Sequence, residues 1–156
     1  MALLAAVSVT IFVAEAQIPP IVPVAGVKLG LANIVTLTAA SLLGRREAGL
    51  ILLVRIILGN MFAGGVSAMI FSFAGGAFAY VTMCATIKRF PEELVWVVSI
   101  FAAIAHNFGQ IFAAAVLTRS SALFAFFPVL AVSGIITGAF TGLAAVYLIK
   151  ALKKRN

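Results

Sequence analysis

The 156-residue sequence contains no aspartate and only one cysteine, and charged residues make up only 10% of it. Without aspartate, the acidic clusters that hold magnesium for diphosphate chemistry cannot be built, and the neighbouring Glu92 and Glu93 are a poor substitute. The nucleotide-binding loop GxxxxGK[ST], the HExxH and CxxC motifs and the serine elbow are absent as well. We therefore assign no catalytic residue, no metal site and no cofactor, and expect any ATP-driven step to come from other subunits.

The scarcity of charge, together with an apolar fraction of 64%, leaves too little polar surface to cover a soluble globule. The chain is therefore predicted to be an all-α integral membrane protein, with a single transmembrane helical domain over residues 1–156. Eleven basic residues stand against four acidic ones, but they lie in short clusters between apolar segments. We interpret these clusters as topology signals and contacts with the lipid bilayer, and expect no nucleic-acid partner.

Charges, prolines and glycine pairs divide the chain into six apolar segments, which predict a bundle of six transmembrane helices. A straight span needs about 20 apolar residues, so the second and third segments predict short or tilted helices. The first segment ends in Ala-Glu-Ala, which is similar to a signal-peptide cleavage site, but it lacks a charged start and is predicted to remain as a helix. The segments cover residues 2–17, 28–43, 47–62, 66–87, 94–117 and 122–149.

The distribution of basic residues predicts the orientation of this bundle. Eight lysines and arginines fall on one side of the six predicted spans and two, Lys28 and Arg119, fall on the other, while Arg55 lies inside a span. Because cytoplasmic loops carry the excess of basic residues, both termini are predicted to be cytoplasmic. The acidic residues of the basic loops are interpreted as solvated charges.

In this orientation, most of the strongly polar side chains in the spans fall at a similar depth, in the outer half of the membrane. Ionisable groups at membrane depth cost about 3 kcal/mol or more unless they are paired or hydrated, so their default interpretation is functional. They predict an outward-facing pocket in which Lys28 and Arg55 favour an anionic group and the amides orient the ligand. Serines and threonines of the inner halves are expected to bond to backbone carbonyls. The candidate binding residues are Glu15, Lys28, Asn33, Arg55, Asn60, His106, Asn107 and Gln110.

Structural alternatives remain open for several of these residues. Glu15 with Arg55, or Glu15 with Lys28, alternatively forms a salt bridge that only locks helices together. Lys28 alternatively extends its ammonium to the outer lipid headgroups. His106, which shares a helix face with Gln110, alternatively forms a hydrogen bond between helices.

Small residues at four-residue spacing form a second pattern. Gly134, Gly138 and Gly142 create a ridge on the last helix, and Ala2 and Ala6 form a weaker pair on the first. Such spacing allows another helix to approach closely, so these five residues are candidates for a partner interface. Packing within the chain is the alternative.

The stretch PVAGVKLGLANIVTL, followed by LGRREAGLILLVRIILGNMFAGG, resembles a bacterial membrane family. This family is called heptaprenyl diphosphate synthase component I, or the Gx transporter family. The resemblance extends over nearly the whole chain and is strongest over residues 23–65, although Ala25 stands where a second proline is expected. The family is similar in size and six-helix layout to the substrate-binding S components of energy-coupling factor (ECF) transporters.

The resemblance implies a receptor in the bacterial cytoplasmic membrane that captures a small molecule from outside. It also implies two kinds of partner, a coupling transmembrane subunit and two ATPases. In such receptors an alanine-rich face of the first helix contacts the coupling subunit, which corresponds to Ala2 and Ala6 here. We therefore expect a substrate-binding membrane subunit for a small, anionic molecule; an accessory subunit of heptaprenyl diphosphate or menaquinone synthesis and a structural scaffold are the alternatives.

Overall fold

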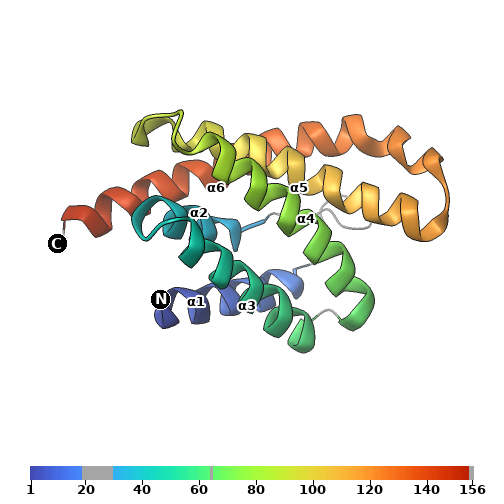
Figure 1. Ribbon diagram of the computed structural model, residues 1–156, viewed down its shortest axis with the longest axis horizontal. Helices are drawn as coiled ribbons and strands as arrows, with labels where there is room; N and C mark the ends of the chain where they lie inside the picture. The colour runs from blue at the N-terminus through green and yellow to red at the C-terminus, as the bar shows by residue number, and fades with distance from the viewer. Residues whose placement is uncertain (19–29, 64, 155–156) are drawn as a thin grey trace.

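The computed structural model describes residues 1–18, 30–63 and 65–154, and this part of the chain forms helices and no strand. Six α-helices follow one another in the order that the apolar segments predict, which confirms the all-α membrane bundle (Figure 1). Short 3-10 helices, Glu92–Leu94 and Ser121–Phe126, precede the last two α-helices. The α-helices are α1 (Ala2–Ala16), α2 (Asn33–Leu42), α3 (Arg45–Ala63), α4 (Gly65–Thr86), α5 (Val95–Thr118) and α6 (Phe127–Lys154).

The helices differ in their ability to cross a bilayer. Among the residues that the structure describes, three segments, in α4, α5 and α6 with their flanking turns, are long and apolar enough to span it. By contrast, α2 has only 10 residues and is about 15 Å long, half of the roughly 30 Å hydrocarbon core. It is shorter than the predicted segment 28–43 because it begins at Asn33, after a turn at Gly30 with a φ of 71°. Glycine adopts this left-handed conformation without steric cost.

The short helix α2 lies at the centre of the bundle, where it contacts α1, α3, α4 and α6. Its five consecutive residues from Val35 to Ala39 are all buried, whereas a surface helix would bury only one face. Leu37 packs into a core cluster with residues of α4, α5 and α6, while Val35 and Ala39 pack against α3. Neighbouring helices must enclose α2 because lipid offers no hydrogen bonds to the backbone groups at the ends of a short helix.

The basic segments gather at one end of the bundle. The start of α1 and the end of α6 lie there together with the α2–α3 turn and the α4–α5 connection, on the left in Figure 1. The α5–α6 connection, which contains Arg119, lies at the opposite end. The orientation prediction depends on this clustering of basic segments at one end. It stays a prediction that this end faces the cytoplasm.

Single cysteines placed at Arg45 or Lys154, in a chain with Cys84→Ser, are expected to resist a membrane-impermeant thiol reagent in intact cells. They should react once the cells are permeabilised, because basic loops remain in the cytoplasm. A cysteine at Arg119 is the matched control and should react from outside. Labelling of position 45 or 154 from outside would invert the orientation and move the predicted binding residues to the inner half.

Candidate functional site

Three of the predicted binding residues meet between α1, α2 and α3, and we call Glu15, Asn33 and Arg55 the Arg55 cluster. Nη1 of Arg55 donates a hydrogen bond to Oδ1 of Asn33 at 3.0 Å, and the charge of Glu15 attracts the guanidinium. Oε1 of Glu15 accepts a hydrogen bond from the backbone N–H of Gly30 at 2.6 Å. Glu15 is only 6% exposed and Arg55 only 4%. The cluster therefore joins the first three helices through buried charge.

Local packing explains why these side chains meet. Gly59 lies one turn beyond Arg55 on α3, and a Cβ at this position would lie only 2.4 Å from Cδ1 of Phe12. The missing side chain lets α1 approach α3 closely at this point. Because Glu15 is three residues beyond Phe12, it lies on the same side of α1 and faces α3 near Arg55.

Several buried polar atoms of α1, α2 and α3 have no hydrogen-bond partner within the described residues. They are Nε of Arg55, the Oγ atoms of Ser8 and Ser41, and the Oγ1 atoms of Thr36 and Thr38. The four hydroxyls correct the expectation that inner-half serines and threonines bond to backbone carbonyls, which holds for Thr82. A buried donor without an acceptor is costly, so a ligand oxygen would be favourable beside such atoms. Sequence reasoning missed these hydroxyls because most helical threonines do satisfy themselves.

The amides of Asn60 and Asn107 form contacts within and between helices. Nδ2 of Asn60 donates to the carbonyl oxygen of Ile56 at 2.7 Å, and Oδ1 of Asn60 accepts from Oγ of Ser72 at 3.3 Å. Nδ2 of Asn107 donates to the carbonyl oxygen of Leu130 at 2.7 Å. These bonds tie α3 to α4 and α5 to α6, and a role of either amide in ligand binding stays a prediction.

His106 and Gln110 lie on the face of α5 that packs against Gly75 of α4. A Cβ at Gly75 would lie 2.8 Å from Cε1 of His106 and 2.9 Å from Cγ of Gln110, so the glycine makes room for both side chains. These two residues belong to the α4–α5 contact, whereas the Arg55 cluster belongs to α1, α2 and α3. The structure thus places the predicted pocket residues in separate groups, while Lys28 lies outside the described residues.

The glycine ridge of α6 is occupied within the chain. Gly134, Gly138 and Gly142 are buried. A Cβ at Gly138 would lie 2.7 Å from Cα of Ile100, and one at Gly142 would lie 2.5 Å from Cα of Trp96. The expectation that a partner helix docks on this ridge is corrected, because α5 fills the space that the glycines leave.

The small residues of α1 remain accessible. Ala2, Ala6 and Thr10, each one turn apart, are exposed, and the Thr10 hydroxyl donates back to the carbonyl oxygen of Ala6 at 3.0 Å. An exposed row of small side chains leaves room for a partner helix. Contact of Ala2 and Ala6 with a coupling subunit stays a prediction.

A family model described as heptaprenyl diphosphate synthase component I matches residues 4–148. The chain belongs to the heptaprenyl diphosphate synthase component I family. This match confirms the family that residues 23–65 indicate, whereas the likeness to ECF S components stays a prediction. A search of curated proteins and a search of solved structures found no match.

The name of the heptaprenyl diphosphate synthase component I family raises the question of magnesium, which diphosphate chemistry commonly uses with oxygen ligands. The donor set of this chain fits such a site poorly. The sequence has no aspartate, and no three His, Cys, Asp or Glu side chains gather within residues 1–18, 30–63 and 65–154. Glu92 is paired with Lys153. The family name therefore identifies no catalytic residue in this chain.

Proposed function

We propose that this member of the heptaprenyl diphosphate synthase component I family is a substrate-binding membrane subunit, similar to an S component, that captures a small anionic molecule. The observation that carries the proposal is the buried guanidinium of Arg55. Its Nη1 bonds to Asn33, and its Nε has no partner among the described residues. A buried guanidinium that retains a donor favours a carboxylate or phosphate oxygen.

Glu15 supports this role by balancing the charge of Arg55. A lone buried cation at membrane depth would be costly, and a nearby carboxylate lowers that cost. The Glu15 carboxylate also accepts the backbone hydrogen bond of Gly30, just before α2, so it holds the chain at the entrance of this helix. In this proposal Lys28 supplies a second cation to the ligand, whereas His106 and Gln110 lie in the separate α4–α5 contact, and their part in ligand binding stays a prediction.

Energy for uptake comes from other chains in this proposal. The sequence contains no nucleotide-binding loop, so a coupling transmembrane subunit and two ATPases would drive the transport cycle. The exposed pair Ala2 and Ala6 offers α1 as the contact with the coupling subunit.

A second candidate function is an accessory role in heptaprenyl diphosphate synthesis, and the family description favours it. In that role the chain would hold or deliver a prenyl diphosphate while a separate catalytic subunit extends it. The third possibility, a scaffold without a ligand, is favoured by no specific contact.

We expect that purified protein incubated with magnesium, isopentenyl diphosphate and an allylic primer produces no elongated prenyl diphosphate above the level of a blank without protein. The reason is that no aspartate is available to hold the magnesium that such transfer uses. Radiolabelled products separated by chromatography provide the measurement, and a soluble prenyl transferase provides the positive control. Elongation by the purified chain alone would refute the receptor proposal and assign catalysis to this protein.

A further inference from the structure

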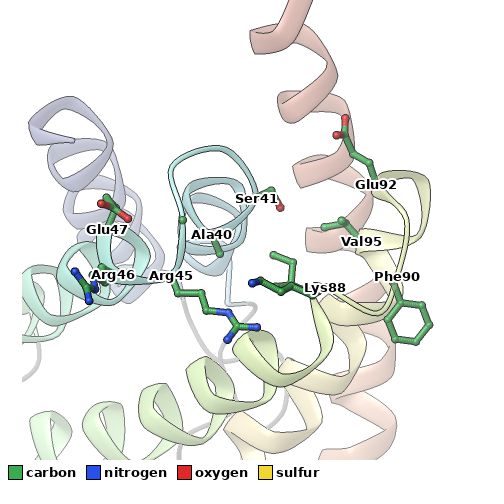
Figure 2. A pocket seen from close by; sticks show the side chains of 11 residues that line it. Ala40, Ser41, Arg45, Arg46, Glu47, Lys88, Phe90, Glu92 and Val95 are labelled. Carbon is green, nitrogen blue, oxygen red and sulfur yellow. The ribbon is translucent and has the colours of Figure 1, made fainter.

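An open pocket with a volume of about 570 Å³ lies at the basic end of the bundle, away from the Arg55 cluster. Its walls come from the end of α2, the α2–α3 turn and the α4–α5 connection (Figure 2). Arg45 and Arg55 are ten residues apart in α3, which corresponds to about 15 Å. The pocket is therefore separate from the receptor site proposed above, and its test does not depend on that proposal.

Two cations meet at this pocket from facing walls. Arg45 begins α3, Lys88 follows α4, and both are exposed pocket-lining residues. In Figure 2 their side chains point toward one another, whereas Arg46 and Glu47 lie together farther from Lys88. The carboxylate of Glu92, also in the wall, is paired with Lys153. Neither Arg45 nor Lys88 has a carboxylate partner in the part of the chain that the structure describes.

Further donors lie in the same pocket wall. The first turn of α3 borders the pocket, and the backbone N–H groups at a helix N-terminus attract anions. Oγ of Ser41 in the wall is buried and has no hydrogen-bond partner among the described residues. Positive charge and a helix N-terminus together form the chemistry that binds phosphate groups, while Oγ of Ser41 lies behind the pocket surface.

We propose that the pocket between Arg45 and Lys88 binds the phosphate or diphosphate group of a ligand at the basic end of the bundle. The arginine fork bonds two phosphate oxygens at once, and the lysine contributes a point charge from the opposite wall. The basic residues of these two turns thus bind a specific anion in addition to setting the orientation of the chain.

Calorimetric titration tests this site with the whole chain in phosphatidylcholine nanodiscs, using inorganic diphosphate and farnesyl diphosphate as separate probes and empty nanodiscs as the blank. Saturable binding of at least one probe, at one per chain, is expected. Arg45→Gln and Lys88→Gln should each weaken it by about tenfold or more, because each removes a charge-assisted bond. The matched control is Arg89→Gln, which removes an exposed charge beside Lys88 that does not line the pocket, and it should change the affinity by less than about threefold.

Comparison of the probes identifies the source of the phosphate. Equal affinity for both probes indicates a free phosphate ester, and tighter binding of farnesyl diphosphate indicates an amphiphile. Loss of diphosphate binding when phosphatidylglycerol replaces part of the lipid indicates a lipid headgroup. The proposal is overturned if neither probe binds saturably in neutral lipid, or if Arg89→Gln weakens binding as much as Lys88→Gln. Circular dichroism of each variant shows that the helices are retained, and Arg45→Lys should recover part of the lost affinity.

Discussion

Replacement of Arg55 with methionine is expected to lower the free energy of unfolding by about 3–5 kcal/mol, because it removes the buried guanidinium whose positive charge attracts the buried carboxylate of Glu15. Asn33 loses its hydrogen-bond donor in the same variant. Reversible denaturation with SDS in mixed micelles, followed by circular dichroism, measures this change.

The double variant Glu15→Gln with Arg55→Met is expected to recover most of the lost stability. Glutamine is neutral and can still accept the hydrogen bond from Gly30, so no uncompensated charge remains. A double-mutant cycle then isolates the coupling between the two residues. Leu53→Met, at a position 44% exposed on the same helix, is the control for the new methionine. If Arg55→Met is as stable as this control, the cluster does not hold α1, α2 and α3 together.

Valine in place of Gly142 is expected to destabilise the bundle by about 3 kcal/mol, through separation of α5 and α6. The obstacle is backbone, since a Cβ at this position would lie 2.5 Å from Cα of Trp96 and 2.9 Å from its carbonyl oxygen. A neighbouring side chain could rotate away from the new methyl groups. Backbone atoms cannot, so the whole of α5 would have to shift away from α6. Membrane helices associate mainly by close packing, so this loss is not offset by a hydrophobic gain.

Leu143→Val is the matched control for this variant, because it introduces the same residue at the next position, which is 49% exposed. It should change stability by no more than about 0.5 kcal/mol. The same SDS titration measures both proteins. Equal stability of the two variants would show that α5 does not need the glycine ridge of α6.

Six helices and the gathering of basic loops at one end could be predicted because both follow from local composition. Apolar segment length indicates a helix in a membrane, and charge clusters indicate its ends. The sequence also placed Glu15 and Arg55 at a similar depth, which is why an electrostatic attraction between them could be anticipated. The sequence could not show that Asn33 accepts a hydrogen bond from Arg55, because this bond depends on how α2 packs between α1 and α3.

Other features depend on which helix lies opposite, and sequence pattern does not specify this. A row such as Gly138 and Gly142 indicates a close approach, but the same spacing serves a partner protein or a neighbouring helix. Here α5 fills the row. The Oγ1 atoms of Thr36 and Thr38 are buried without hydrogen-bond partners because α2 lies at the centre of the bundle. The short apolar segment of α2 did not reveal this central position.

The receptor role of the Arg55 cluster is tested most directly by mass spectrometry of small molecules extracted from the purified protein. Wild type, the double variant Glu15→Gln with Arg55→Met, and Leu53→Met are purified in parallel from the same host. We expect an anionic molecule at about one per chain in wild type and in Leu53→Met, and its loss from the stable double variant, because the guanidinium that binds it is gone. Recovery of the same molecule at the same level from the double variant would contradict the account.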